Sequence, residues 1–233
     1  MNIVVFQTDN RSVEVIEYVK LINKRHALFL NYKYHFEHMD EKYYEKISPC
    51  TAKIFVIHNY IHNNPVDILI FLDTDAWIQN PYKLSVLIDK LIKSDKYGCL
   101  SRDPYNPKDT YINSGSFILK INDFTKHMYK QLIADMQNNT DFVNKWPFDQ
   151  YYFSGFIYKN REKFMIFKPD VLNTPDGTIL RHNWYKNQQM HNDIVGHLID
   201  MDLLLDDKVW PNPNNDTPNR LEAILEEKEE KGE

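Results

Sequence analysis

The stretch ILIFLDTDAWIQNP, residues 68–81, decides the fold of this chain. With the residue before it, its apolar start predicts a strand over 67–72 that is buried on both faces of a sheet. Asp73 and Asp75 follow this strand directly. Side chains at i and i+2 of an extended chain point the same way, so both carboxylates can face one point in space. Ligand sites of open α/β sheets lie beyond the carboxyl ends of strands, and the pair therefore marks a candidate site.

The aspartate pair favours a bound cation. Two carboxylates held close together repel each other unless a cation lies between them. Oxygen ligands suit hard divalent ions, so the pair predicts an Mn²⁺ or Mg²⁺ site. An Asp-x-Asp pair also arises as a turn or helix cap, and this second interpretation is open for the motif taken alone. The buried strand before it favours the metal.

The rest of the chain alternates between strand and helix patterns. Strands are predicted at 2–6, 26–31, 97–101, 116–121 and 163–169. Helices are predicted at 12–24, 50–62, 81–95, 122–137 and 149–158, and helical periodicity returns over 188–205. Such alternation predicts an α/β sheet of parallel strands joined by right-handed crossovers.

Composition sets the domain organisation and excludes several classes. The 233 residues suit one domain over 1–210, followed by a Pro- and Asn-rich linker and a charged tail over 211–233 that can lead to further domains. A net charge of −5 without a basic block argues against a nucleic-acid partner. No apolar run approaches the roughly 18 residues of a membrane span.

Cysteine usage and the first residues indicate the compartment. Cys50 and Cys99 are the two cysteines, and neither belongs to a CxxC pair. A disulfide framework or a structural zinc site is therefore not expected. The N-terminus turns polar after six residues, which does not fit a signal peptide. These features predict a reducing, cytoplasmic compartment.

Two further motifs follow the aspartate pair: NSGSFILKIN at 113–122 and WPFDQYYF at 146–153. Together with DTDAW at 73–77, their order and spacing resemble glycosyltransferases of the GT-A fold. The similarity extends to galactosyl- and mannosyltransferase-like families and to glycosyltransferase domains of large algal viruses, the chloroviruses. It covers about residues 1–190. It implies a GT-A-like, nucleotide-diphospho-sugar transferase fold, with a Rossmann-like, mostly parallel sheet flanked by helices.

The resemblance also implies an activity. It is that of a metal-dependent hexosyltransferase that moves a sugar from a nucleotide-sugar to a glycan acceptor. A UDP-sugar is the favoured donor, with GDP as the alternative nucleotide. For a viral protein the acceptor would be a glycan on a viral glycoprotein, and the compartment would be the host cytoplasm.

By the same resemblance, the residues after the first strand bind the nucleotide. Thr8, Asp9 and Arg11 lie there, where Asp9 can accept from a ribose hydroxyl or uracil N–H and Arg11 can face a phosphate. The competing interpretation is a solvated helix N-terminus. Thr74, within the aspartate motif, joins this group. Lys53 corresponds to a basic donor-binding residue, against the alternative of a surface lysine.

The metal ligands implied by the resemblance are Asp73, Asp75 and a late histidine. His182 is preferred over His191 and His197 because it lies in the loop-like segment RHNWYKN, 181–187, whereas the other two fall on a predicted helix. In the same segment, Lys186 is expected to approach the diphosphate on loop closure, and Trp184 to cover the site.

The two later motifs supply the sugar and acceptor side. Asn113 and Ser114 are expected there, beside the missing side chain of Gly115, unless they form a plain turn before a strand. Asp149 and Gln150 are the catalytic candidates. Asp149 can accept sugar hydroxyls or, in an inverting enzyme, deprotonate the acceptor. A helix cap after Pro147 is the alternative, and inversion or retention stays open.

Three other functions share parts of this pattern. Haloacid-dehalogenase-like phosphohydrolases also carry Asp-x-Asp after an apolar strand, but near the start of the chain and without Trp77 at the second residue after the pair. A non-catalytic nucleotide-sugar-binding module would use the carboxylates for affinity alone. A nucleotidyltransferase would use paired aspartates for two-metal chemistry, although just 6 glycines leave no Gly-rich phosphate loop.

Overall fold

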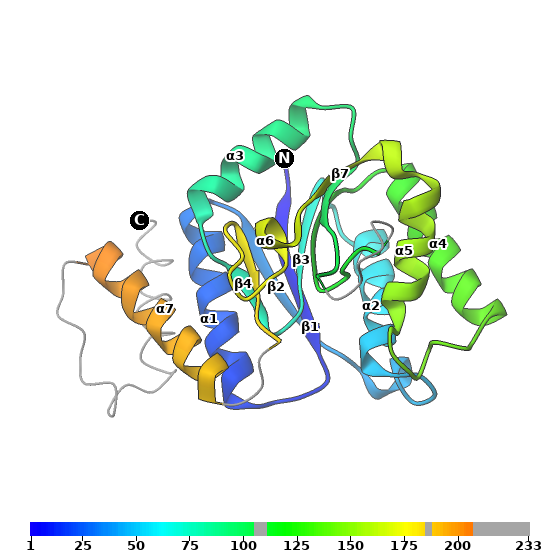
Figure 1. The fold of residues 1–233 in the computed structure, drawn as a ribbon, viewed down its shortest axis with the longest axis horizontal. Coiled ribbons are helices and arrows are strands. Elements are labelled where there is room, and N and C mark those ends of the chain that lie inside the picture. Colours follow the sequence, from blue (N-terminus) through cyan, green and yellow to red (C-terminus); the bar gives the residue numbers. More distant parts are fainter. Residues whose placement is uncertain (105–110, 185–187, 207–233) are drawn as a thin grey trace.

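The computed structural model describes residues 1–104, 111–184 and 188–206. Within them, six strands form one sheet in the order β2-β1-β3-β6-β5-β7 (Figure 1). These strands are β1 (Ile3–Asp9), β2 (Lys33–His38), β3 (Ile68–Leu72), β5 (Gly98–Ser101), β6 (Ser116–Lys120) and β7 (Phe164–Phe167). Two short strands, β4 (Ala76–Ile78) and β8 (Leu180–His182), pair with each other beside the main sheet.

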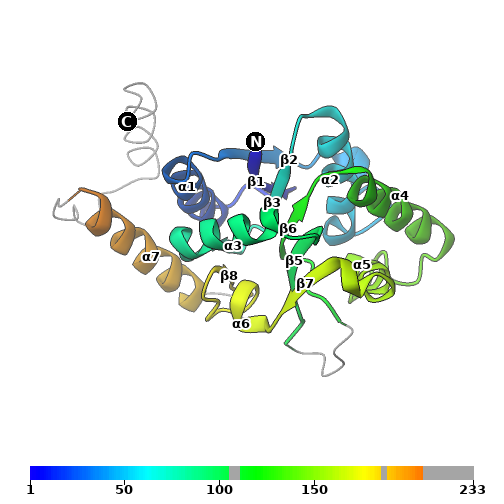
Figure 2. The same ribbon diagram turned by 90° about the horizontal axis from the view of Figure 1, so that it is seen from above.

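Helices cover both faces of the sheet, as the two views in Figures 1 and 2 show. One side carries α1 (Glu14–Phe29), α3 (Pro81–Lys93) and α7 (Gln188–Asp206). The other carries α2 (Pro49–Asn63), α4 (Asp123–Asn138) and α5 (Asp149–Lys159). A one-turn helix α6 (Pro169–Leu172) and the 3-10 turns η1 (Glu41–Tyr43) and η2 (Arg161–Lys163) complete the described elements.

Burial explains this three-layer arrangement. All five residues of β3 are buried, and successive side chains alternate between the two faces. Leu69 and Phe71 pack with the core under α2, α4 and α5. Ile68 and Ile70 pack with the core under α3. A central strand with apolar residues on both faces therefore needs a helical layer on each side.

The predicted strand at 26–31 is wrong, because α1 continues to Phe29. Val19, Ile22 and His26 are buried at helical spacing, and the apolar run simply extends this face. The chain turns at Asn31, whose φ of 56° is left-handed, and the second strand begins at Lys33. A short apolar run alone does not separate a strand from the end of a helix.

The first strand is longer than its apolar core predicts. β1 runs to Asp9 rather than ending at residue 6, because its polar end pairs with β2 as far as Asp9 and His38. The pair β4 and β8 was not predicted at all, since neither strand exceeds three residues. The other predicted strands and helices are confirmed, with ends shifted by a few residues.

The sheet is mostly parallel, with one reversal. β1 pairs in parallel with β2 and β3, and β5 pairs in parallel with β7. β6 is antiparallel to both β3 and β5, so the sheet is mostly parallel, as the resemblance to GT-A enzymes implies. In this register Leu72 lies opposite Ser116. The end of β3 therefore meets the start of β6, and the residues just outside the two strands become neighbours.

Two buried amides fix the chain as it leaves β3. Gln7 donates to the carbonyls of Asp73 and Ala76 at 3.0 and 3.4 Å. Asn23 of α1 donates to the Ala76 carbonyl at 3.0 Å and accepts from the Ile78 N–H at 2.9 Å. Both side chains are fully buried. These bonds set the path of the aspartate motif.

Several expectations fall partly or wholly outside the described residues. The predicted tail over 211–233 and the domain boundary near residue 210 are among them. Among the residues that the structure describes, none of the helices combines the length and apolar character needed to cross a bilayer.

We expect Asn23→Ala to lower the free energy of unfolding by about 2 kcal/mol, because buried backbone groups at Ala76 and Ile78 lose hydrogen-bond partners. Urea denaturation measures the change. Asn63→Ala is the matched control, since the Asn63 side chain bonds Asn59 on an exposed helix face, and it should cost under about 0.5 kcal/mol. Equal losses in the two variants would contradict this assignment.

A histidine pair joins α1 to α7 and makes stability depend on pH. The Nε2 atoms of His26 and His197 lie 3.4 Å apart. Burial, helped by the neighbouring charge, lowers the pKa of His26 to about 3 and that of His197 to about 4. Arg25 and Arg181 face the pair as further positive charges, and Asp200 opposes them. Below pH 6.5 the unfolded chain therefore binds protons that the folded chain does not.

The free energy of unfolding should fall by a few kcal/mol between pH 7 and pH 5, because each pH unit costs about 1.36 kcal/mol per proton bound by the unfolded chain alone. Urea denaturation at both pH values measures this slope. The double variant His26→Gln, His197→Gln removes both titrating groups and should flatten it. An unchanged slope in the double variant would show that other groups carry the dependence.

Candidate active site

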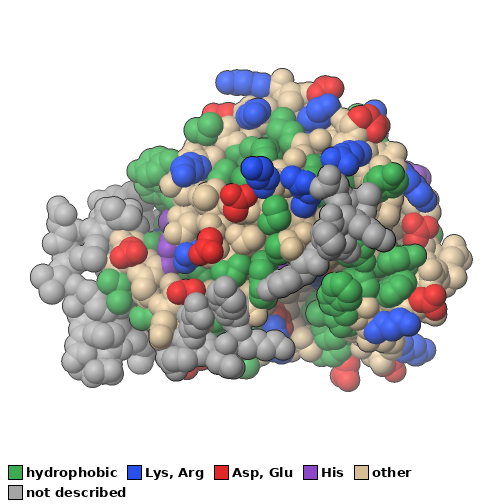
Figure 3. All heavy atoms as spheres, viewed as in Figure 1, with side chains coloured by type: hydrophobic (Ala, Val, Ile, Leu, Met, Phe, Trp, Pro, Cys, Tyr) green, Lys and Arg blue, Asp and Glu red, His purple; other side chains and the backbone are tan. Residues whose placement is uncertain are grey.

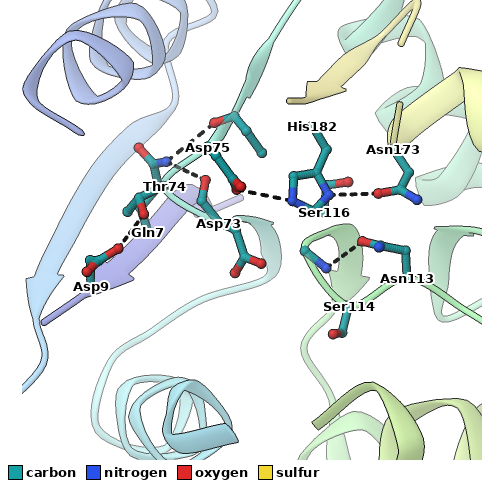
Figure 4. Close-up of polar contacts among 12 residues, drawn as sticks. Gln7, Asp9, Asp73, Thr74, Asp75, Asn113, Ser114, Ser116, Asn173 and His182 are labelled. Carbon is teal, nitrogen blue, oxygen red and sulfur yellow. Dashed lines mark hydrogen bonds and ion pairs between the residues drawn. The ribbon is translucent and has the colours of Figure 1, made fainter. Parts of the chain in front are cut away.

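A pocket of about 460 Å³ opens at the carboxyl ends of β1 and β3, beside the turn that precedes β6. It gathers most of the side chains singled out in the sequence. They are Thr8, Asp9, Arg11, Lys53, Asp73, Thr74, Asp75, Asn113, Ser114, Asp149, Gln150 and His182. They come from segments far apart in the chain, and the sheet topology brings them together (Figure 4).

Asp73, Asp75 and His182 form a cluster suited to a metal ion. Each offers one ligand atom, and these atoms lie within 4.8 Å of one another. The two carboxylates are 29% and 36% exposed, toward the pocket, whereas the imidazole is buried. His182 is the last residue of β8 rather than part of a loop. It lies opposite Ala76 in the β4–β8 pair, which explains its position beside Asp75.

A buried asparagine orients the imidazole. His182 Nδ1 lies 2.8 Å from Asn173 Oδ1, and Asn173 is fully buried (Figure 4). Since an amide oxygen is an acceptor, Nδ1 carries the proton that it donates to Asn173. The other ring nitrogen, Nε2, lies 3.1 Å from Asp75 Oδ1. A histidine held through one nitrogen in this way presents the other nitrogen to a metal.

Burial and the charges of Lys53 and His182 set the electrostatics of the cluster. Burial raises the pKa of Asp73 above its ordinary value, although Lys53 opposes this. Burial acts in the same direction on Asp75, but the charge and hydrogen bond of His182 bring that pKa below its ordinary value. Burial would lower the pKa of His182, and the charge of Asp75 raises it instead. A bound cation would relieve the carboxylate repulsion directly.

Gly115 makes room for the cluster. A Cβ atom at this position would lie 2.1 Å from His182 Cε1 and 2.8 Å from Asp73 Oδ2. Its carbonyl accepts from the Asp73 N–H at 2.7 Å, and its own N–H donates to Asn113 Oδ1 at 2.7 Å. The glycine therefore lets the turn before β6 press against the two ligands, which any side chain would prevent.

Lys53 of α2 joins the aspartate cluster to the second motif. Its Nζ lies 3.0 and 3.1 Å from the two carboxylate oxygens of Asp73 and 3.5 Å from Asp149 Oδ2. It also donates to the Ser114 carbonyl at 3.2 Å. The side chain is buried, which excludes the alternative of a surface lysine. Burial would lower its pKa, but the charges of Asp149 and Asp73 raise it, so the ammonium stays charged.

Asp149 and Gln150 begin α5 at the pocket. Burial raises the pKa of Asp149 to about 6, although Lys53 opposes this. Its Oδ2 is buried and has no hydrogen-bond partner. The Gln150 amide donates to Asp103 at 2.7 Å, and its oxygen lies 3.4 Å from Asn113 Nδ2. A carboxylate whose Oδ2 accepts no hydrogen bond but faces the Lys53 ammonium, and a fixed carboxamide, thus lie next to each other at the start of α5.

At the end of β1, the Asp9 carboxylate in the pocket already accepts several hydrogen bonds. Asp9 accepts from the backbone N–H, Nε and NH2 group of Arg11 at 2.8, 2.9 and 2.8 Å. The Thr74 hydroxyl also donates to it. Burial would raise the pKa of Asp9, but these hydrogen bonds bring it below its ordinary value. Any further donor to Asp9 must therefore share this carboxylate with Arg11, whose side chain is 63% exposed.

The donor set fits a hard divalent cation. Among the described residues that line the pocket, four aspartates outnumber the three basic side chains, which are Arg11, Lys53 and His182. Asp73 and Asp75 supply carboxylate oxygens and His182 an imidazole nitrogen. Mn²⁺ and Mg²⁺ accept such oxygen-rich sets. The group thus has the chemistry of a metal site, whichever of the two ions binds.

Trp184 and Lys186 were also expected at the site. Trp184 packs edge-on against His182, with ring centroids 5.3 Å apart, rather than lining the pocket. Lys186 lies outside the described residues. His191 and His197 fall on α7, as predicted, and pack against Tyr18 and His26.

Sequence reasoning missed the residues that support the site. Asp103 holds Gln150, and Asn173 holds His182, but each stands in a loop without a motif. Phe148 was also missed. It has a φ of 54°, which is uncommon for a large side chain, immediately before Asp149. Its sequence signal was weak, since Pro147 before it indicated no more than a helix start.

Comparisons with known proteins agree on the fold. No protein-family model matches the chain, and no curated protein matches its sequence. A glycosyltransferase involved in the glycosylation of the major capsid of PBCV-1 is similar in structure, with a TM-score of 0.67 and 13% identity, over 82% of this chain and 99% of that chain. The galactosyltransferase LgtC, with donor and acceptor sugar analogues, gives a TM-score of 0.56 and 13% identity, over 84% and 96%.

An active-site mutant of LgtC gives a TM-score of 0.53 and 14% identity, over 91% of this chain and 98% of that chain. The architecture is therefore the GT-A glycosyltransferase fold, as the sequence motifs predict. At these identities the likeness establishes the fold, and the chemistry must be argued from the pocket.

Gly115→Ala should weaken Mn²⁺ binding at least about 10-fold, because the new methyl group displaces His182 and Asp73 from each other. Titration calorimetry with Mn²⁺ alone measures this without any substrate. Gly196→Ala is the control, since a Cβ there meets no atom within 4 Å. Equal Mn²⁺ affinity in both variants would mean that the ion, if bound, uses other ligands.

Proposed function

We propose that this protein is a metal-dependent glycosyltransferase. It transfers a sugar from a nucleotide-sugar, with UDP as the favoured nucleotide, to a glycan or glycoprotein acceptor. The observation that carries this proposal is the Asp73, Asp75 and His182 cluster at the rim of a GT-A sheet. By analogy with the capsid-modifying relative, the acceptor is a glycan on a viral glycoprotein.

The ligand cluster defines one half of the reaction. Asp73, Asp75 and His182 would hold Mn²⁺ or Mg²⁺, which as a Lewis acid stabilises negative charge on a departing diphosphate. Arg11 is exposed at the pocket edge and Lys53 is charged within it, so both can attract phosphate oxygens. We assign Thr8, Asp9 and Thr74 to the nucleotide, and Lys186 to the diphosphate.

The start of α5 defines the other half. In the transfer, the bond between the anomeric carbon and the phosphate oxygen breaks, and its electron pair stays on the diphosphate. An acceptor hydroxyl oxygen bonds to that carbon, and its proton passes to the departing diphosphate or, in an inverting enzyme, to Asp149. Asp149, ionised at neutral pH with one oxygen that accepts no hydrogen bond, accepts from the hydroxyls of the transferred sugar. Gln150, fixed by Asp103 and Asn113, faces the reacting carbon.

We assign Asn113 and Ser114 to the sugar or acceptor side, with Trp184 as a cover behind His182. We propose the cytoplasm, of the host if the chain is viral, as the compartment. Both cysteines lie in the described part of the chain and are free thiols, which suits a reducing environment. Acidic and basic side chains are interspersed on the face in Figure 3, which gives no support to a nucleic-acid partner.

Asp75→Ala should reduce Mn²⁺-dependent release of UDP from UDP-sugars at least about 100-fold, since charge on the departing diphosphate loses its stabilisation. The measurement is coupled UDP detection over a panel of UDP- and GDP-sugars. Asp89→Ala, on the exposed face of α3, is the matched control and should keep full activity. Undiminished activity in EDTA would refute metal dependence. Binding of a nucleotide-sugar without turnover would favour a non-catalytic binding module instead.

A further inference from the structure

A second groove of about 710 Å³ lies between α4 and α5, outside the candidate active site. Its wall on α5 carries Tyr151, Gly155 and Tyr158, at positions i, i+4 and i+7 of one helix face. All three are exposed, with Tyr151 at 39% and Tyr158 at 59%. Figure 3 shows apolar and aromatic side chains gathered over the region of α5 in Figure 1.

Gly155 leaves the helix surface open between the two tyrosines. A Cβ atom at this position would meet no heavy atom within 4 Å. No neighbouring side chain therefore requires a glycine here, although glycine is less stable than alanine in a helix interior. What the missing side chain provides is a flat floor, on which a ring can lie against the backbone of α5.

The opposite wall is polar and nearly neutral. The end of α4 supplies Asp135 and Asn138, and Asn139 follows directly after the helix. The positive charge of Lys159, on α5, offsets the charge of the one carboxylate. Amide and carboxylate groups of this kind bond to hydroxyls, which both donate and accept. This lining has no net charge that would attract a highly charged ligand, but its polar groups can bond to the hydroxyls of a neutral, polyhydroxylated ligand.

The aromatic wall is preorganised. The Tyr151 ring packs on Phe142, with centroids 4.1 Å apart, and edge-on against Tyr152 at 5.2 Å. Tyr152 is anchored in turn by its hydroxyl, which donates to the Asn139 carbonyl at 2.5 Å. Rigid aromatic surfaces lose little conformational entropy when a ligand packs on them.

Two segments of the chain contribute residues both to the groove and to the candidate active site. α5 starts at Asp149 and Gln150 in the pocket and then runs along the groove to Tyr158, about 12 Å further at 1.5 Å per residue. The segment before β6 also lies along both sites, because Tyr111 lines the groove and Asn113 lines the pocket. The Ser154 hydroxyl joins α5 to this segment: it accepts from the Ile112 N–H at 3.0 Å and donates to the Ile112 carbonyl at 3.1 Å.

We propose that this groove binds a neutral oligosaccharide, as the part of the acceptor glycan remote from the reacting hydroxyl. The apolar faces of sugar rings would pack on Tyr151 and Tyr158, over Gly155, and their hydroxyls would bond to the α4 wall. As an acceptor subsite, it rests on the transferase function proposed above. Binding energy from remote parts of a substrate serves to position its reacting group.

The test is binding of neutral oligosaccharides, without any nucleotide-sugar. The full chain is applied to an array of neutral glycans built from glucose, galactose, mannose, xylose, fucose and N-acetylglucosamine. The glycan that binds most strongly is then titrated by calorimetry. Gly155→Trp fills the groove from an exposed position, and its Kd should rise at least 10-fold. Tyr158→Ala, which removes bulk instead, should also raise the Kd.

Gln137→Trp is the matched control, because it places the same side chain on an exposed part of α4 outside the groove lining. Its Kd should stay within twofold of the unmodified protein. UDP–Mn²⁺ binding, measured in parallel, should be the same in all four proteins.

Two results would overturn the inference: no glycan bound by the unmodified protein at millimolar concentration, or equal glycan affinity in Gly155→Trp. Glycan binding that Gly155→Trp removes, in a protein that turns over no nucleotide-sugar, would instead refute the transferase proposal and leave a saccharide site in the groove.

Discussion

Two carboxylates at the end of a buried strand are the constraint on which the rest of the site depends. Asp73 and Asp75 leave the sheet where its central strand ends, and neither can move far, because the backbone between them is held by buried amides. Their repulsion must be balanced by positive charge. In the described structure the Lys53 ammonium lies beside Asp73, and the His182 imidazole lies beside Asp75.

Buried amide side chains hold the metal-ligand candidates in position. Gln7, Asn23 and Asn173 are fully buried, and each bonds to the aspartate turn or to its histidine. A buried amide needs its donors and acceptors satisfied, so it fixes whatever it bonds to. This supporting layer lets flexible groups such as carboxylates converge on one point.

Helix α5 links this centre to the surface groove. Its first residues, Asp149 and Gln150, belong to the pocket, and its outer face carries the exposed tyrosines. Its inner face, with Phe153 and Ile157, is packed in the core. A helix anchored in this way is rigid, so a ligand along its outer face would be held in a fixed position relative to the pocket. The two sites would then act on one extended substrate.

The sequence by itself determined the local features of this protein. The apolar run 67–72 predicted the central strand, and the helices with clear periodicity, such as 50–62 and 122–137, were found in place. The spacing of the three motifs predicted the GT-A fold. Local pattern failed at 26–31, where an apolar run fits a strand and a helix end equally well.

The tertiary structure alone decided how these pieces meet. The reversal of β6 sets Gly115 against Asp73, and the pairing of β4 with β8 sets His182 beside Asp75. Asp103 and Asn173 act across gaps of 47 residues and 9 residues, and neither stands in a motif. The physical reason is that strand register and long-range hydrogen bonds depend on partners distant in the chain, about which local composition carries no information.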